Sequence, residues 1–145
     1  MKNKVLKFAL VGCGRISKRH SELLGDGVIK NATLSAICDI NIEKARLIGE
    51  KYQIPYFSDM DEMMQTVNID VVVILTESGN HAKHTIMLAK YGKDIIVEKP
   101  MALKVTDAEE MLLECKKNNV KLFVVKQNRF NVPVIKLMEA VKSKR

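Results

Sequence analysis

Hydrophobic residues in this chain gather into short continuous runs, separated by stretches in which apolar residues recur with a helical period. The short runs predict strands at residues 5–11, 34–38, 56–57, 70–75, 94–97 and 121–125. The stretches between them predict helices at residues 16–24, 59–66, 81–91 and 107–117, one between Asn41 and Pro55, and a final one from Pro133 toward Arg145. Asn41 is expected to cap its helix. Thr106 is expected to do the same in a capping box with Glu109.

The regular alternation of strands and helices indicates the fold class. Strands joined by helices of about ten residues form βαβ units, whose strands are parallel. Residues 70–75, Asp-Val-Val-Val-Ile-Leu, form a β-branched run without polar alternation, which is typical of a parallel strand buried on both faces. Right-handed crossovers then place helices on both sides of the sheet. We therefore predict an α/β protein with a Rossmann-type, doubly wound parallel sheet.

Composition and charge narrow the class of protein further. The 145 residues are 47% hydrophobic and 28% charged, as expected for one globular domain. The net charge of +7 comes from scattered lysines without a nucleic-acid-binding motif. We therefore expect a solvated basic surface, suited to an anionic cofactor and substrate, and no nucleic-acid partner. No apolar run approaches the roughly 20 residues of a membrane span, and the basic start lacks a cleavage site, so a cytoplasmic protein without a membrane partner is expected.

The number and spacing of the cysteines argue against a disulfide-bonded or metal-binding protein. Cys13, Cys38 and Cys115 are an odd number and include no C-x-x-C pair. This pattern predicts neither a disulfide framework nor a metal site. It is typical of reduced thiols in an intracellular protein.

The first predicted strand is followed by a glycine-rich segment, Gly12-Cys13-Gly14-Arg15-Ile16-Ser17, which matches G-x-G-x-x-G with serine in the last place. A strand before and a helix after are the context in which this pattern binds a dinucleotide. Gly12 permits the tight turn, and Gly14 lets the backbone approach a pyrophosphate without an intervening Cβ. The helix start at Arg15 and Ile16 directs free N–H groups to the phosphates. Ser17 is small enough for close packing of helix on strand.

An acidic residue, Asp39, directly follows the second predicted strand. It lies farther from Gly12 than the usual spacing of about 20 residues, and an extra loop at residues 25–32 accounts for the difference. A carboxylate here accepts hydrogen bonds from both hydroxyls of the adenosine ribose and repels a 2′-phosphate. The pattern therefore predicts NAD rather than NADP as the cofactor. The alternative is that Asp39 is only a helix N-cap.

Three later segments make the prediction more specific: residues 76–81 (Thr-Glu-Ser-Gly-Asn-His), 98–100 (Glu-Lys-Pro) and 126–131 (Lys-Gln-Asn-Arg-Phe-Asn). With the glycine turn, and in this order, they resemble the glucose-fructose oxidoreductase/inositol dehydrogenase (Gfo/Idh/MocA) family, whose signature is Glu-Lys-Pro after a strand. Within it they look most like the dehydrogenases that use NAD to oxidise the C3 hydroxyl of UDP-N-acetylglucosaminuronic acid for surface polysaccharide. Glu77 stands where many family members have proline, which favours this uronate-acting subgroup.

The resemblance and the strand ends together indicate a candidate site. Lys99 follows a buried strand at the carboxyl edge of the sheet, where a partly desolvated lysine can transfer a proton and polarise the C3 oxygen. Lys99 is therefore the predicted catalytic residue, and the alternative is that it is only a surface lysine before a helix-breaking proline. The predicted cofactor-binding residues are Gly12, Gly14, Arg15, Ile16, Asp39, Ile40, Thr76, Ser78, His81, Glu98, Lys99 and Gln127, and the predicted substrate-binding residues are Lys99, Asn128 and Arg129.

Some of these assignments have a structural alternative. His81 is expected to cap its helix and, by resemblance, to lie near the nicotinamide, but a lone histidine is often structural. Arg129 is suited to bidentate binding of a carboxylate or phosphate, or it braces the loop before Pro133. His20 and His84 lie within predicted helices and are assigned no function.

The resemblance also implies a domain organisation. Residues 1–126 form the NAD-binding domain, and residues 127–145 form a connecting segment and the start of a helix that leads to the family's second α/β domain, absent from this chain. The chain is thus expected to bind NAD without turning over sugar, and the full-length protein to bind a nucleotide sugar as a homo-oligomer. Two alternatives stay open: the cofactor domain of an inositol-type polyol dehydrogenase, and a non-catalytic dinucleotide-binding module.

Overall fold

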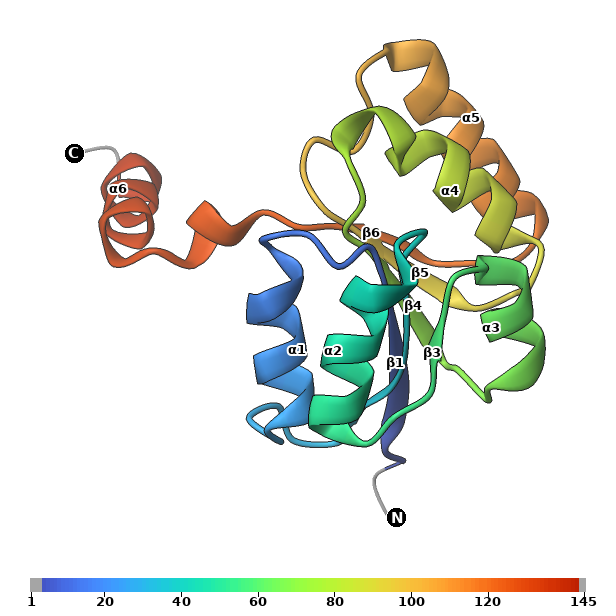
Figure 1. Cartoon of the computed structure of the whole chain (residues 1–145). Helices are drawn as coiled ribbons and strands as arrows, with labels where there is room; N and C mark the ends of the chain where they lie inside the picture. Colours follow the sequence, from blue (N-terminus) through green and yellow to red (C-terminus); the bar gives the residue numbers. More distant parts are fainter. Residues whose placement is uncertain (1–3, 144–145) are drawn as a thin grey trace.

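A computed structural model of the protein describes residues 4–143. At its centre is a six-stranded sheet, in which every pairing is parallel and the strand order is β3-β2-β1-β4-β5-β6 (Figure 1). The strands are β1 (Leu6–Val11), β2 (Ala32–Cys38), β3 (Tyr56–Phe57), β4 (Val71–Ile74), β5 (Asp94–Val97) and β6 (Leu122–Val124). The predicted Rossmann-type parallel sheet is confirmed.

Helices cover both faces of this sheet, as a doubly wound fold requires. They are α1 (Ser17–Gly25), α2 (Ile42–Tyr52), α3 (Met60–Thr66), α4 (His81–Ala89), α5 (Val105–Lys117) and α6 (Val132–Lys142), with short 3-10 helices η1 (Ser78–Asn80) and η2 (Gln127–Phe130). Helices α1 and α2 pack on one face, and α3, α4 and α5 pack on the other. Within residues 4–143, every helix is too short or too polar to traverse a membrane.

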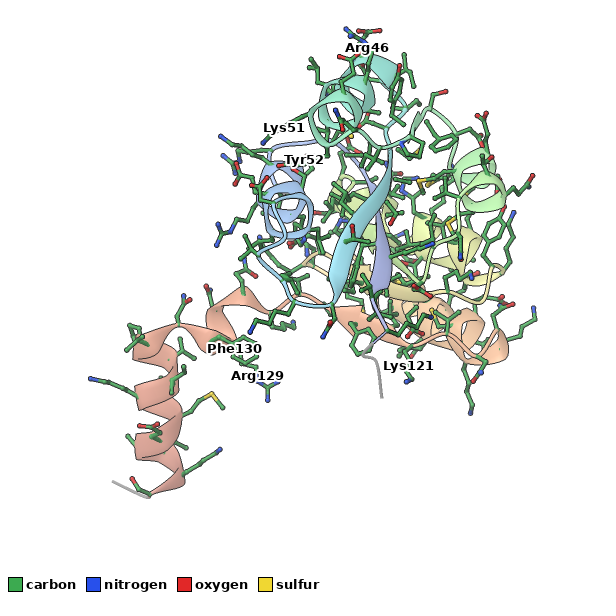
Figure 2. The ribbon with its side chains drawn as sticks, turned by 90° about the horizontal axis from the view of Figure 1, so that it is seen from below. Arg46, Lys51, Tyr52, Lys121, Arg129 and Phe130 are labelled. Atoms are coloured by element: carbon green, nitrogen blue, oxygen red, sulfur yellow. The ribbon has the colours of Figure 1, made fainter. Side chains whose placement is uncertain are left out.

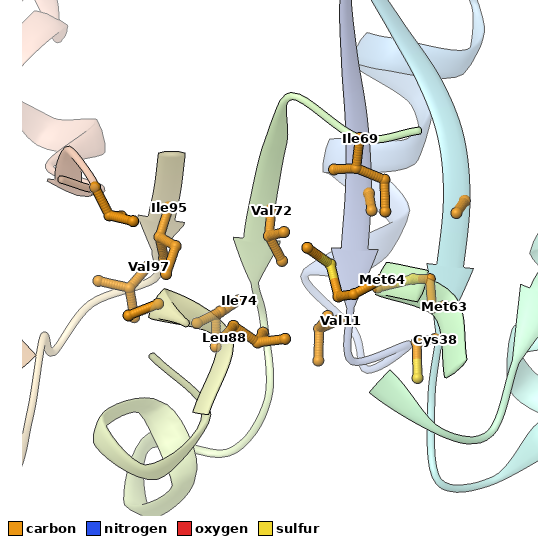
Figure 3. Close-up of a cluster of buried hydrophobic side chains, with 14 of the residues drawn as sticks. Val11, Cys38, Met63, Met64, Ile69, Val72, Ile74, Leu88, Ile95 and Val97 are labelled. Atoms are coloured by element: carbon orange, nitrogen blue, oxygen red, sulfur yellow. The ribbon is translucent and has the colours of Figure 1, made fainter. Parts of the chain in front are cut away.

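Two layers of apolar side chains hold the helices on the sheet. In β4, Val72 and Ile74 face the layer under α3–α5, whereas Val73 faces the layer under α1 and α2, and none of the three is more than 2% exposed. Figure 3 shows Val72 and Ile74 in the first layer, with Met63 from α3 and Leu88 from α4. Because β4 is buried on both sides, its sequence is continuously apolar.

The helix caps confirm one prediction and correct another. The Asn41 side chain accepts hydrogen bonds from two N–H groups in the first turn of α2, so Asn41 caps this helix as predicted. The predicted capping box at Thr106 is wrong, because α5 begins one residue earlier, at Val105. Thr106 is therefore already inside the helix, and its hydroxyl donates to the Asp107 carboxylate instead.

The sheet reverses its strand order at β1, which has β2 on one side and β4 on the other. In open parallel sheets, the crevice outside the carboxyl ends of the strands at such a switch point binds the ligand. The segments that follow β1, β2, β4 and β5 contain most of the predicted site residues. The topology therefore gathers residues from four separate parts of the chain at one edge.

The last helix, α6, stands away from the sheet in both views (Figures 1 and 2). None of its residues is buried, and Val132, Leu137 and Val141 are each more than 60% exposed. The residues of the predicted connecting segment, 127–145, include η2 and α6, which ends at Lys142. Residues 144 and 145 of the predicted final helix, and residues 1–3 of the predicted domain, lie outside the described residues.

Candidate functional site

The turn after β1 depends on the conformation of Gly12. Its φ of +101° lies in a region that residues with a side chain rarely adopt. A Cβ built on Gly12 would lie only 2.8 Å from the backbone carbon of Leu75, just after β4. The N–H of Gly12 donates to the carbonyl oxygen of Cys38 over 2.8 Å, which holds the turn against β2. A glycine is therefore needed where β1, β2 and β4 come together.

The next glycine, Gly14, borders open space instead. No atom lies within 4 Å of the position that its Cβ would take. Among residues 4–143, no hydrogen-bond partner is found for the N–H groups of Gly14, Arg15 and Ile16, which directly precede α1. Ser17, in place of the third glycine, is 2% exposed and donates its hydroxyl to the Gly14 carbonyl oxygen over 2.6 Å. Free donors at a helix start, beside open space, fit the pyrophosphate of a dinucleotide.

Asp39 follows β2 and is tied to the glycine turn. Its Oδ2 accepts from the N–H of Cys13 over 2.6 Å, and its Oδ1 accepts from the N–H of Asn41 over 2.8 Å. Asn41 is the cap of α2, so the alternative in which Asp39 is only a helix cap is wrong. Each carboxylate oxygen keeps a free lone pair that can accept from a ribose hydroxyl. Ile40, beside Asp39, is 95% exposed.

The thiol of Cys13 lies within the turn and remains protonated. Burial, together with the negative charge of Asp39, raises the pKa of Cys13 to about 12. The raised pKa keeps the thiol uncharged even in mildly alkaline solution. Cys13 thus serves the site through its backbone N–H, which orients Asp39.

The segment after β4 contains a hydroxyl–imidazole pair that the sequence analysis missed. Thr76 Oγ1 lies 3.0 Å from Nδ1 of His84 on α4. Burial, with a smaller effect of Lys83, lowers the pKa of His84, so its ring is neutral at pH 7. The pair fixes the Thr76 side chain at the edge of the sheet. Ser78, also predicted to bind the cofactor, lies half-buried in η1 nearby.

His81 is the first residue of α4, and Asn80 occupies the cap position without a side-chain bond. The prediction that His81 caps the helix is therefore wrong. Its ring is 1% exposed and points inward, with Nδ1 2.7 Å from the carbonyl oxygen of Pro100 and Nε2 2.9 Å from that of Thr76. These contacts use both ring nitrogens, which favours the structural alternative. His81 links the end of β4 to the Glu-Lys-Pro segment.

Glu98, directly after β5, is only 7% exposed. Its Oε2 accepts from the N–H of Lys99 over 3.0 Å, and its Oε1 lies 3.0 Å from Nε2 of His20 on α1. No function was assigned to His20 from the sequence. The signal that could have found it is helical spacing, because His20 falls in the same stripe as the buried Ser17 and Leu24.

Lys99 itself is exposed, and the expected partial desolvation is wrong for this chain. The reason is that β5 already ends at Val97, so Lys99 lies beyond the packed part of the strand. Within residues 4–143, the Lys99 ammonium group takes part in no ion pair. Its backbone is held by Glu98, while its side chain is free to reach a ligand.

The segment after β6 brings the predicted substrate residues next to Lys99. Gln127, Asn128 and Arg129 on η2 line an open groove of about 650 Å³ together with Lys99 and Lys126. Figure 2 shows Arg129 at the base of the projecting segment. All five residues are exposed, and three of them are cations. The groove is therefore suited to a negatively charged ligand.

Comparison with known proteins places this chain in a family. Residues 6–126 match the family model of the Gfo/Idh/MocA oxidoreductases, described as an oxidoreductase family with an NAD-binding Rossmann fold. The chain belongs to the Gfo/Idh/MocA family. It thus contains an NAD-binding Rossmann domain of an oxidoreductase family, which agrees with the resemblance found in its motifs.

Relatives of this Gfo/Idh/MocA chain are named for, or were solved with, different small molecules. The myo-inositol 2-dehydrogenase of Thermotoga maritima is 32% identical over 139 residues, which are 95% of this chain and 41% of that protein. The WlbA dehydrogenase of Bordetella pertussis, solved with NADH and UDP-GlcNAcA, is 37% identical with a TM-score of 0.91, over 98% of this chain and 43% of that one. The WlbA dehydrogenase of Chromobacterium violaceum, solved with the same ligands, is 33% identical with a TM-score of 0.93, over 100% and 42%. The chain spans about two fifths of the length of these relatives.

Proposed function

We propose that this chain is the cofactor-binding half of an NAD-dependent dehydrogenase that oxidises the C3 hydroxyl of a UDP-N-acetylglucosaminuronic-acid-type sugar nucleotide. One observation carries the proposal: Lys99, after β5, and Asn128 and Arg129, on η2, line the same groove. The groove begins at the carboxyl ends of the strands, where this fold binds its ligands. Residues 1–126 would be the cofactor domain, and residues 127–145 the segment that leads out of it.

The residues around the switch point fit NAD. The free N–H groups from Gly14 to Ile16 would bind the pyrophosphate, and Asp39 would accept from the ribose hydroxyls while excluding a 2′-phosphate. Ile40 would contact the adenosine end, whereas Thr76, Ser78, Glu98 and Gln127 would lie at the nicotinamide end. His81, whose two ring nitrogens both contact backbone carbonyls, would support that end without binding the cofactor. Bound NAD would supply the acceptor for the hydride.

Lys99 would handle the proton of the reaction. Oxidation of a secondary alcohol releases a hydride and a proton, and a side chain at hydrogen-bond distance must take the proton. As an amine Lys99 accepts it, and as an ammonium it polarises the C3 oxygen. Because Lys99 is exposed in this chain, the role requires that further groups desolvate it. The chain alone is therefore proposed to bind NAD without turnover.

The positive charge of the groove supports an anionic sugar nucleotide as the substrate. Lys99, Lys126 and Arg129 present three cations, and a guanidinium binds a carboxylate or phosphate through two parallel hydrogen bonds. A UDP-linked uronic acid carries both groups. The two WlbA dehydrogenases, whose structures contain NADH and UDP-GlcNAcA, provide the precedent within the family.

A second candidate is an inositol-type polyol dehydrogenase, favoured by the 32% identity to the Thermotoga enzyme. An uncharged polyol would gain little from the cations of the groove, which is why we rank it second. A non-catalytic dinucleotide-binding module would need neither Lys99 nor the groove residues.

Three experiments test the proposal. Calorimetric titration of the 145-residue chain with NAD and NADP should give tighter binding of NAD, and equal or tighter binding of NADP would overturn our interpretation of Asp39. The substrate is tested in the full-length protein by following NADH formation with UDP-N-acetylglucosaminuronic acid and with myo-inositol. Turnover of the polyol alone would replace the first candidate by the second, and size-exclusion chromatography of the same protein would test the expected homo-oligomer.

A further inference from the structure

The contact between His20 and Glu98 joins two parts of the cofactor site that are far apart in the sequence. His20 lies on α1, whose start carries the free N–H groups, and Glu98 follows β5. Nε2 of His20 lies 3.0 Å from Oε1 of Glu98, and the two side chains are 20% and 9% exposed. A carboxylate only accepts hydrogen bonds, so Nε2 carries the hydrogen of this bond. The partly buried position shields the bond from competition by water.

Glu98 also contacts the backbone of Lys99. Its second oxygen, Oε2, accepts from the N–H of Lys99 over 3.0 Å. With one oxygen bonded to α1 and the other to the backbone after β5, the orientation of the carboxylate is set from both sides. The Lys99 side chain takes part in no ion pair with the described residues. Its placement toward a ligand therefore depends on the backbone that Glu98 holds.

The strand order assigns the two ends of this contact to different parts of a bound dinucleotide. The order β3-β2-β1-β4-β5-β6 puts Asp39, after β2, on one side of β1 and Glu98, after β5, on the other. In this fold each half of the sheet binds one nucleotide, with the pyrophosphate at the turn between them. The His20–Glu98 bond thus spans from the pyrophosphate helix to the nicotinamide half.

We propose that His20 is a positioning residue that, through Glu98, holds Lys99 and the nicotinamide half of the site in register with the start of α1. The inference rests on the proposed function, because it assumes that the chain binds NAD at the switch point. His20 touches neither cofactor nor substrate in this scheme. Its effect is geometric, and shifts of about 1 Å are enough to impair a reaction.

The test uses the 145-residue chain with two ligands and two matched variants. NADH contains the nicotinamide, whereas ADP-ribose retains only the adenosine, pyrophosphate and second ribose. His20→Gln places an amide N–H near the position of Nε2, and His20→Asn is one methylene shorter and cannot reach Glu98. We expect His20→Asn to weaken NADH binding about tenfold and to change ADP-ribose binding less than about twofold. His20→Gln should restore NADH binding to within about threefold of the wild type. The fluorescence spectrum of bound NADH should be shifted in His20→Asn and match the wild type in His20→Gln.

A second variant keeps the test decisive if His20→Asn does not fold, as judged by its circular dichroism. His20→Leu keeps much of the bulk of the ring but has no N–H to donate to Glu98. It should therefore also weaken the binding of NADH more than the binding of ADP-ribose.

The outcomes separate this inference from the function on which it rests. Equal losses for both ligands, or unchanged NADH binding in His20→Asn and His20→Leu, would overturn the positioning role while leaving the cofactor site in place. A wild-type chain that binds neither NADH nor ADP-ribose would overturn the proposed function and this inference together.

Discussion

Replacing the two glycines of the turn by alanine should produce two different defects. Gly12→Ala adds a Cβ at a φ of +101°, 2.8 Å from the backbone of Leu75 and Thr76. Gly14→Ala adds a Cβ with no atom within 4 Å, at a backbone conformation that alanine can adopt. The first change should therefore destabilise the fold. The second should leave the fold intact and impair the binding of NAD, because its Cβ enters the space where the pyrophosphate approaches the backbone.

The expected magnitudes follow from these contacts. A left-handed conformation costs an L-residue about 1–2 kcal/mol, and relieving an overlap with the backbone costs about 1–3 kcal/mol more. Replacing glycine also lowers the conformational entropy of the unfolded chain, which stabilises the folded state by about 0.5 kcal/mol. Gly12→Ala should thus lower the free energy of unfolding by about 2–4 kcal/mol, or Tm by roughly 10 °C. Gly14→Ala should change the free energy of unfolding by less than about 0.5 kcal/mol. It should weaken the binding of NAD at least about tenfold.

Thermal and urea unfolding, followed by circular dichroism, measure the free energy of unfolding. Calorimetric titration measures the affinity for NAD. Each variant is the control for the other, since both add one methyl group to the same turn. The reasoning would be refuted if Gly12→Ala unfolded at the wild-type midpoint, or if Gly14→Ala bound NAD as tightly as the wild type.

Four further predictions concern single side chains. Asp39→Asn should weaken NAD about tenfold and reduce the discrimination against NADP, as measured by calorimetry; a retained preference would contradict the proposed role. Lys99→Met should change the free energy of unfolding by less than about 0.5 kcal/mol, because the side chain is exposed, yet abolish NADH formation in the full-length protein. Hydrogen bonds from Lys4 and from a backbone N–H hold the pKa of Asp70 below its usual 3.8. This bonding therefore adds stability above about pH 4 that is lost as the pH falls through the folded-state pKa. Asp70→Asn should cost about 0.5 kcal/mol at pH 7 and nothing at pH values where the wild-type carboxyl is also protonated, which urea unfolding across pH can check. Cys13, with its pKa raised to about 12, should resist a disulfide reagent at pH 8 until the chain is unfolded; rapid labelling of the folded chain would refute this.

The fold was largely predictable because its determinants are local in the sequence. Continuous apolar runs such as residues 70–75 correspond to strands buried on both faces, and the amphipathic stretches between them correspond to helices. The handedness of βαβ units then leaves few arrangements. The cap of α5 was misplaced because Thr106 and Glu109 match a capping box wherever the helix begins, and only the backbone shows that it begins at Val105.

The candidate site was predictable where it follows a strand or a turn. Gly12, Asp39 and Lys99 each come directly after a strand, and parallel strands place their carboxyl ends at one edge of the sheet. The burial of a side chain at such a position depends on neighbours that are distant in the sequence. Lys99 was accordingly expected to be partly buried, and the structure shows it exposed.

The sequence by itself therefore determined the parallel sheet, the glycine turn and the acidic partner of that turn, because each follows from spacing along the chain. Only the tertiary structure showed that Glu98, after β5, meets His20 on α1, that Thr76 meets His84, and that the His81 ring lies between two backbone carbonyls. Helical spacing indicates only which face of a helix a histidine occupies, and which acceptor its imidazole reaches is decided by how the helices pack on the sheet.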